Sequence, residues 1–203
     1  MKHLIIFTRY PEPGRTKTRL IPALGEVGAA KLHQQMAEYT IAQGRELRKI
    51  LDLSVEIRFI GGNTQKMQQW LGEDVSYKDQ GEGDLGVKME RSLIESFNQL
   101  HKQVIIIGTD CPSINYQLLS TAFEKLNDDD LVIGPAVDGG YYLIAMKQII
   151  PQIFKNIPWG TDQVLIETIK AAKPQNLSIG YLPTLNDIDR PEDLVYCNLF
   201  KKG

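Results

Sequence analysis

Val104-Ile105-Ile106-Ile107-Gly108-Thr109-Asp110 is the stretch that decides the fold. Its first four residues are all β-branched, and a continuous apolar run of this kind is typical of a parallel strand that is covered on both faces. The run ends in a glycine, a threonine and a carboxylate. We therefore expect a central strand at 104–107 and a turn that carries Asp110 directly after it.

Strand-like and helix-like segments alternate on both sides of this stretch. The apolar patterns predict strands at 4–8, 55–60, 75–78, 131–133, 141–146 and 178–182, and helices at 26–51, 65–71, 86–100, 115–126, 161–172 and 190–200. Such alternation predicts an α/β fold, a three-layer sandwich with a mostly parallel central sheet. The strands that flank Asp138-Gly139-Gly140 can add an antiparallel pair. No linker or repeat interrupts residues 1–203, so we expect a single domain.

The composition excludes several classes of protein. The 203 residues carry a formal net charge of −2, which provides no basic field for nucleic acid. No apolar run approaches the roughly 20 residues that cross a bilayer. Two cysteines, Cys111 and Cys197, are too few for a disulfide scaffold. We expect a cytoplasmic protein that binds neither nucleic acid nor membrane.

The loop after the first expected strand is strongly basic. Ligands in such sheets bind at the carboxyl ends of the strands, and four cations fall there within eleven residues: Arg9, Arg15, Lys17 and Arg19. Two prolines stiffen the loop, and Gly14 permits a backbone angle that a side chain would resist. The loop is not a Walker A motif, because Thr16 rather than glycine precedes Lys17. A solvated basic loop is the alternative, but the position favours anion binding, first by Lys17 and Arg19.

Two acidic segments can meet at the same edge of the sheet. Asp110 follows the central strand, and Asp189 lies in a late acidic segment; carboxylates so placed can hold a divalent cation. Each has a structural alternative. Asp110 or Ser113 could cap the following helix, and Asp189 with Glu192 three residues later has the pattern of a capping box.

Four segments in order resemble one known family. They are FTRYPEPGRTKTRL (7–20), IGTDCPS (107–113), GPAVDGGYYLI (134–144) and DIDRPEDL (187–194). Together they resemble the DUF2064 family of glycosyltransferase-A-like proteins, also called transferase 1 associated with radical-SAM and selenium domains. The resemblance spans about residues 3–195. It implies a glycosyltransferase-A fold and kinship with sugar-phosphate, molybdopterin and phospholactate nucleotidyltransferases.

The resemblance also implies roles for single residues. It implies nucleotide binding by Thr8, Arg9, Gly14, Arg15, Lys17, Arg19, Gln80, Gly81 and Gly83, the last three as a loop against base and ribose. It makes Asp110 a metal ligand and Asp189 the favoured second ligand for Mg²⁺ or Mn²⁺, with Asp187 as the fallback. The sequence departs from the acidic Asp-x-Asp motif of glycosyltransferases, because Cys111-Pro112 follows Asp110. That departure puts glycosyl transfer in doubt more than nucleotidyl transfer.

The hairpin region supplies candidates for the acceptor side. Asp138 can bind hydroxyls or act as a base, and the glycines beside it let a small acceptor approach the backbone. The proposed acceptor residues are Asp138, Gly139, Gly140, Tyr141 and Trp159. The same Asp-Gly-Gly run is also a good hairpin turn. Which of Tyr141 and Tyr142 faces the cleft depends on a strand register that the sequence leaves open.

The sequence thus predicts a metal-assisted transferase that uses a nucleotide-activated donor and a small-molecule acceptor. Lys17, Arg19, Asp110 and Asp138 are its expected catalytic residues. A non-catalytic nucleotide-binding or regulatory module is the alternative. An NAD-dependent oxidoreductase is excluded by the missing Gly-x-Gly-x-x-Gly after the first strand. Cys111 is a poor nucleophile candidate, because no histidine lies near it in sequence.

Overall fold

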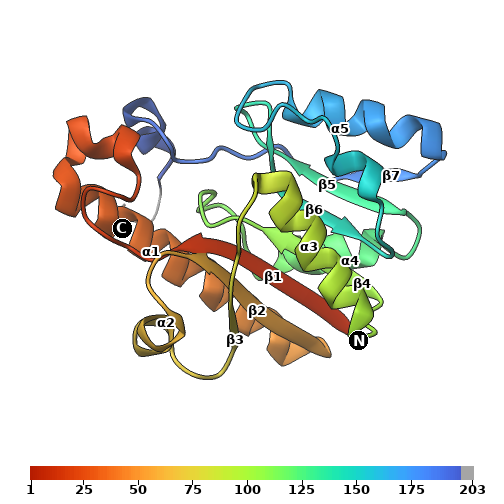
Figure 1. Ribbon diagram of the computed structural model, residues 1–203, viewed down its shortest axis with the longest axis horizontal. Coiled ribbons are helices and arrows are strands. Elements are labelled where there is room, and N and C mark those ends of the chain that lie inside the picture. Colours follow the sequence, from red (N-terminus) through yellow and green to blue (C-terminus); the bar gives the residue numbers. More distant parts are fainter. Residues whose placement is uncertain (198–203) are drawn as a thin grey trace.

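A seven-stranded sheet forms the centre of the computed structural model, which describes residues 1–197 (Figure 1). The strands are β1 (Lys2–Arg9), β2 (Leu53–Ile60), β3 (Ser76–Asp79), β4 (Gln103–Ile107), β5 (Leu131–Pro135), β6 (Tyr141–Met146) and β7 (Ile179–Tyr181). Their order is β3-β2-β1-β4-β6-β5-β7. Strand β6 runs antiparallel to β4 and β5, and the other pairs are parallel. The predicted mostly parallel sheet with an antiparallel element is confirmed.

Helices cover both faces of the sheet. The α-helices are α1 (Ile21–Ile50), α2 (Thr64–Leu71), α3 (Leu85–Asn98), α4 (Tyr116–Lys125) and α5 (Val164–Ala172). The 3-10 helices are η1 (Thr18–Leu20), η2 (Pro151–Phe154), η3 (Lys173–Gln175) and η4 (Pro191–Tyr196). Helix α1 begins before the predicted residue 26, and non-helical backbone at Gly25 interrupts it. The predicted α-helix at 190–200 is wrong in type, because η4 is a 3-10 helix. Residues 198–200 of that prediction lie outside the described residues.

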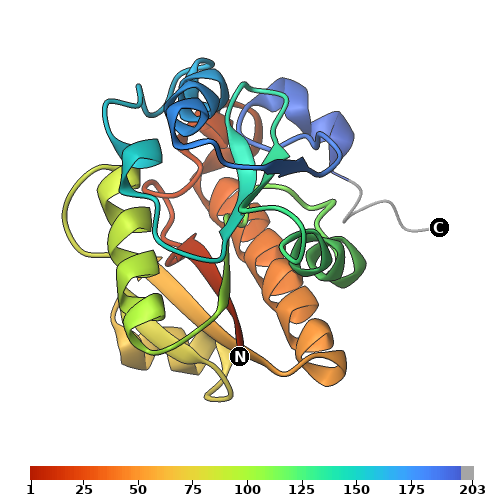
Figure 2. The same cartoon turned by 90° about the vertical axis from the view of Figure 1, so that its right-hand side faces the viewer.

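Strand β1 shows why the fold has three layers. Leu4 and Ile6 are fully buried in a cluster with residues of α1, α2 and α4, whereas Ile5 and Phe7 join a cluster with residues of α3 and α5. Successive side chains of a strand point to opposite faces, so an uninterrupted apolar strand needs a cover on both sides. In Figure 2, α1 and α4 lie on one side of the sheet and α3 lies on the other. The predicted three-layer sandwich is confirmed.

The strand order creates a crevice between the ends of β1 and β4. The chain moves outward from β1 through β2 to β3 and then returns to place β4 on the other side of β1. At such a switch point the loops after the two strands diverge and leave room for a ligand. The basic loop after β1 and the Asp110 turn after β4 therefore face each other.

The segment after β7 closes over this crevice. Leu185 pairs with Ala136 beside β5, and the amide of Ile188 donates to the carbonyl of Asp110 at 2.8 Å. The Ile188 side chain is fully buried in a cluster with Leu20 and Met36. In Figure 1 this late segment, drawn in blue, runs from the β7 side across to the first residues of α1. This packing brings the late acidic segment onto the end of β4.

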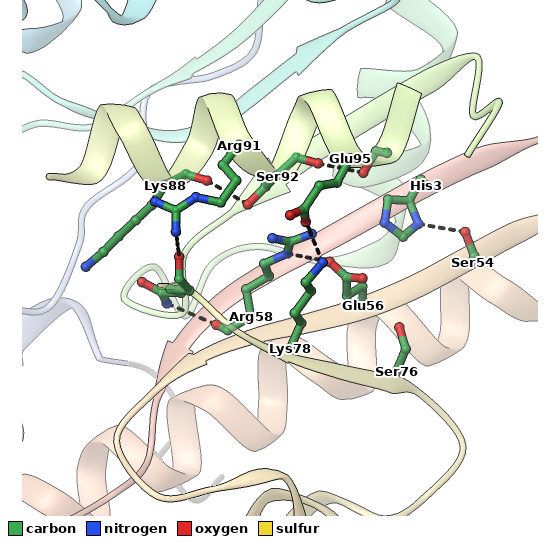
Figure 3. A network of polar contacts seen from close by, with 12 residues as sticks. His3, Ser54, Glu56, Arg58, Ser76, Lys78, Lys88, Arg91, Ser92 and Glu95 are labelled. Atoms are coloured by element: carbon green, nitrogen blue, oxygen red, sulfur yellow. Dashed lines mark hydrogen bonds and ion pairs between the residues drawn. The ribbon is translucent and has the colours of Figure 1, made fainter. Parts of the chain in front are cut away.

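A buried polar network lies between β2 and α3 (Figure 3). The Arg58 side chain is 2% exposed, and its guanidinium pairs with Glu56 and, at 2.6 Å, with Glu95 of α3. Lys78 of β3 also contacts Glu95, at 2.8 Å. The Gln80 amide group donates to the carbonyls of Arg58 and Thr8 at 3.0 and 3.1 Å. The network therefore fixes Gln80 beside the end of β1.

None of the helices within residues 1–197 is long and apolar enough to cross a membrane.

Candidate functional site

The loop after β1 is held by a tight turn and a buried hydroxyl. Glu12 to Arg15 form a turn in which the Arg15 amide donates to the Glu12 carbonyl at 3.1 Å, with Gly14 at φ 77°. Proline followed by glycine at the two central positions suits a type II turn. Thr16 is buried and its hydroxyl accepts from the Glu12 amide and donates to the Tyr10 carbonyl. These hydrogen bonds therefore fix the backbone of the loop from which the cationic side chains extend.

Lys17 lies at the centre of the site. Its backbone is left-handed, with φ 50°, and its side chain is only 5% exposed. The Lys17 Nζ lies 2.8 Å from Asp110 Oδ1 and 3.6 Å from Asp189 Oδ1, and donates to the Ile188 carbonyl at 2.6 Å. Burial acts to lower the pKa of Lys17, but Asp110 and Asp189 outweigh it and raise the pKa. The predicted cation and both predicted metal ligands thus meet at one atom.

Asp189 is not the helix cap that its sequence pattern suggested. The N-cap residue of η4 is Arg190, and Asp193, three residues later, accepts hydrogen bonds from the amides of Asp189 and Arg190 at 3.0 and 2.7 Å. The Asp189 carboxylate instead pairs with Lys17 and, at 2.6 Å, with Arg19. The Asp189 side chain therefore contacts the two cations of the site and does not cap η4.

Asp110 is also free of a capping role. The following helix α4 is capped by Asn115, whose side chain accepts from the Leu118 amide at 2.8 Å. Burial acts to raise the pKa of Asp110, but the adjacent Lys17 ammonium outweighs it and lowers the pKa. Asp110 is therefore a charged carboxylate. The neighbouring Cys111 is buried, and burial raises the pKa of its thiol well above the usual range, which leaves it protonated and inert.

A cavity of about 420 Å³ opens between the basic loop and the end of β4. Thr8, Arg9, Arg15, Lys17, Arg19, Gln80, Asp110 and Asp189 are among its lining residues. The side chains of Arg15 and Arg19 are 76% and 63% exposed, so both can turn toward an anion in this cavity. Gly81 and Gly83 have structural surroundings instead: Gly81 lies beneath the Arg91 guanidinium and Gly83 against Val87. Their contact with a nucleotide stays a prediction.

Two further cavities adjoin the first on its acidic side. One, of about 190 Å³, is lined by Asp110, Asp138 and Asp187, among others, and another, of about 470 Å³, by Asp138, Asp187 and Asp189. Burial, with repulsion from Asp138 and Asp110, raises the pKa of Asp187 to about 6. The predicted acceptor carboxylate, Asp138, therefore shares one cavity with Asp110 and another with Asp189 and Arg19.

The Asp138-Gly139-Gly140 run forms the predicted hairpin turn between β5 and β6. The Asp138 carboxylate accepts from the Gly140 amide at 2.8 Å, and the Gly139 carbonyl accepts from the Leu165 amide at 2.9 Å. Asp162 lies so close that a side chain at position 139 would meet its backbone. The glycine is thus required by packing, and its role in acceptor binding stays a prediction.

The register of β6 turns the two tyrosines to opposite faces. The Tyr142 hydroxyl donates to the Pro183 carbonyl at 2.9 Å. The Tyr141 hydroxyl is buried beside Thr168 of α5, and its ring meets Trp159 edge-on. Trp159 in turn covers Gly86 at the start of α3. Both Tyr141 and Tyr142 line the smaller acidic cavity, whereas Trp159 packs between Tyr141 and Gly86.

Two residues of the site, His33 and Thr109, were not predicted from the sequence. His33 lies in the middle of α1, yet its Nε2 donates to the Arg9 carbonyl at 2.9 Å and it lines the cavity beside the basic loop. Thr109 lies 3.3 Å from Thr8, hydroxyl to hydroxyl, and joins the ends of β4 and β1. Thr109 could have been proposed from its place beside Asp110, but His33 depends on a helix-to-strand contact that no local pattern encodes.

The carboxylates of Asp110 and Asp189 suit a site in which both would bind one divalent cation. Within residues 1–197, no group of three or more His, Cys, Asp or Glu side chains is arranged to hold a metal. Asp110 and Asp189 nevertheless both contact one positive centre, the Lys17 ammonium. Mg²⁺ is commonly held by one or two carboxylates, with phosphate oxygens and water as the remaining ligands. Two carboxylates beside a cavity lined by cationic side chains suit that pattern.

Known structures share this fold. A Desulfovibrio desulfuricans G20 protein, provisionally described as a nucleotide-diphospho-sugar transferase, is 30% identical with a TM-score of 0.90, over 100% of this chain and 89% of that one. A 4-diphosphocytidyl-2C-methyl-D-erythritol synthase from Anaerococcus prevotii is 12% identical (TM-score 0.65), over 98% and 97% of the two chains. A CMP:2-keto-3-deoxy-manno-octonic acid synthetase complexed with CTP is 11% identical (TM-score 0.57), over 96% and 95%.

The sequence comparisons agree with this fold. No curated protein matches the chain. The model of a family described as uncharacterized proteins conserved in bacteria, DUF2064, matches residues 43–161, which is more than half of the chain. The chain therefore belongs to the DUF2064 family and has the fold of nucleotide-diphospho-sugar transferases and nucleotidyltransferases.

Proposed function

We propose that this protein is a metal-dependent transferase that moves a glycosyl or nucleotidyl group from a nucleotide-activated donor to a small acceptor. One observation carries the proposal. The cationic loop after β1 and two carboxylates from distant segments, Asp110 and Asp189, meet at Lys17, at the switch point of the sheet. This arrangement suits a nucleotide diphosphate, because its phosphates need cations and a metal needs carboxylates.

The basic side of the site would bind the donor. Arg19 and Lys17 supply positive charge where negative charge develops on the departing phosphate, and Gln80 marks the base and ribose end of the cavity. Asp110 and Asp189 would hold Mg²⁺ or Mn²⁺. When bound, such an ion neutralises the diphosphate and orients it for bond breaking.

The acidic side would bind the acceptor. Asp138 lines both acidic cavities, where its carboxylate can accept a hydrogen bond from an acceptor hydroxyl and take its proton as that oxygen attacks. The fold shared with cytidylyl-transferring and sugar-transferring enzymes supports a nucleotide donor without selecting the bond that breaks.

Arg19→Ala is expected to weaken nucleotide binding about tenfold or more, since a charged hydrogen bond contributes roughly 1.5–3 kcal/mol. A thermal-shift screen of nucleotides and nucleotide sugars with Mn²⁺ identifies the ligand, and calorimetry then compares the variant with wild type. Lys102→Ala is the matched control, because it removes an exposed cation beside the opposite end of β4. Equal affinities of wild type and Arg19→Ala would contradict the assigned phosphate site.

Asp110→Asn is expected to remove the metal-dependent part of the nucleotide's stabilising effect while leaving a smaller metal-independent part. The amide keeps the size of the side chain but loses the charge that a divalent cation requires. The measurement is the thermal shift with nucleotide, with and without Mn²⁺. A variant that retains the full Mn²⁺-dependent shift excludes Asp110 as a ligand. If wild type binds the nucleotide equally well with and without metal, and turns over none of a panel of donors, the result favours a non-catalytic nucleotide-binding or regulatory module.

A further inference from the structure

The Lys17 side chain is turned inward rather than toward open solvent. A lysine that binds phosphate only as a point charge can extend freely into a cavity. Lys17 is instead 5% exposed, on left-handed backbone, with its ammonium held by Asp110, Asp189 and the Ile188 carbonyl. Three oxygens from two distant segments thus surround one ammonium. Lys17 is therefore an internal counterion of the acidic pair.

A divalent cation on this acidic pair would compete with Lys17 for the same two carboxylates. The Lys17 Nζ lies 2.8 Å from Asp110 Oδ1, while Mg²⁺ lies about 2.1 Å from its oxygen ligands. Two cations held by the same carboxylates repel each other, and the Lys17 side chain is 5% exposed, so little water screens its charge. The Lys17 contact and a metal on Asp110 and Asp189 therefore oppose each other.

We propose that Lys17 competes with the metal for Asp110 and Asp189 and thereby couples metal binding to nucleotide binding. This proposal rests on the proposed function. Lys17 also lines the cavity beside the basic loop with Arg9, Arg15 and Arg19, so a polyphosphate there offers the ammonium a new anionic partner. Nucleotide binding frees the carboxylates and strengthens metal binding, and by thermodynamic reciprocity the metal strengthens nucleotide binding by the same factor.

Binding of Mn²⁺ alone tests the proposal. Electron paramagnetic resonance measures free Mn²⁺ during titration of the protein without nucleotide. Lys17→Gln keeps a hydrogen-bonding side chain but removes the charge, and it is expected to bind Mn²⁺ at least tenfold more tightly than wild type, within the range of about 5–150-fold typical of coupled sites. Lys17→Arg keeps the charge and is expected to match wild type.

Two controls isolate the cause. Lys102→Gln removes one exposed positive charge at the opposite end of β4 from Asp110 and is expected to leave Mn²⁺ affinity unchanged. Asp110→Asn combined with Lys17→Gln is expected to lose the gain. Circular dichroism checks folding, and Lys17→Met supplies the same comparison if Lys17→Gln does not fold.

Equal or weaker Mn²⁺ binding by the folded, charge-neutral variant would overturn the competition. Failure of the proposed function has a different signature, because wild type would then bind no nucleotide under any metal condition while the Mn²⁺ comparison remains valid. The two results are thus read from separate titrations.

Discussion

Arg58→Ala is expected to destabilise the protein by about 3–5 kcal/mol, the usual cost of removing one partner from a buried ion pair. The Arg58 side chain is 2% exposed and pairs with both Glu56 and Glu95 (Figure 3). Its loss leaves Glu56 without its cation and leaves Glu95 with Lys78 as its remaining partner. Urea unfolding monitored by circular dichroism measures the change in the free energy of unfolding.

Lys78→Ala is the matched control for the Arg58 network. Lys78 contacts the same Glu95, but its side chain is 48% exposed, so a loss of about 1 kcal/mol or less is expected. Glu56→Gln combined with Arg58→Ala should recover part of the stability, because one uncompensated carboxylate is then neutral. A loss below about 1 kcal/mol for Arg58→Ala alone would show that the buried pair contributes little to folding.

Acidification below pH 6.5 is expected to destabilise the protein through His3. Burial, with the charges of His101 and Arg58, lowers the pKa of His3 from 6.5 to about 4. A histidine that stays neutral in the folded state but protonates when unfolded contributes stability above pH 6.5, and this is lost as the pH falls toward 4. The expected loss is about 2 kcal/mol at pH 5 and about 3 kcal/mol at pH 4.

His3→Asn isolates this effect. The His3 ring stacks on His101 with centroids 4.2 Å apart, and its Nδ1 lies 2.6 Å from the Ser54 hydroxyl. Two other groups also make stability depend on pH. Burial lowers the pKa of His33, which adds to the loss of stability on acidification, whereas the raised pKa of Asp187 reduces that loss. Only the difference in pH dependence between wild type and variant therefore reports on His3. Urea unfolding at pH 7.5 and pH 5 measures it. Identical pH dependence in the two proteins would contradict a neutral buried His3.

Patterns local in sequence predicted most of the fold. The run at 104–107, covered on both faces, predicted β4, and the turn residues at 138–140 predicted the hairpin that places β6 antiparallel to its neighbours. Periodicity could not distinguish the 3-10 helix η4 from an α-helix, since its six residues span too few turns. Strand order was also not encoded locally, because it depends on which edges pair in space.

The site was harder to predict than the fold. The sequence indicated the pair Asp110 and Asp189, and Lys17 as a phosphate ligand, but it did not indicate that Lys17 contacts both carboxylates. That contact depends on Ile188 packing into the cluster with Leu20, across more than 160 residues. The alternative of a capping box formed by Asp189 and Glu192 does not hold, because η4 has Arg190 at its N-cap and Asp193 as the acidic partner three residues later. The two boxes differ by one residue in where the helix begins, and the spacing pattern fits both.

A crystal structure with the nucleotide identified by the thermal-shift screen tests most directly whether this protein binds an activated nucleotide at the end of β1 and β4. The expected result is phosphate density in contact with Arg19 and Lys17, a cation between the phosphates and Asp110 and Asp189, and the base beside Gln80. Nucleotide bound elsewhere, with the Lys17 contacts to Asp110 and Asp189 undisturbed, would contradict the proposed site.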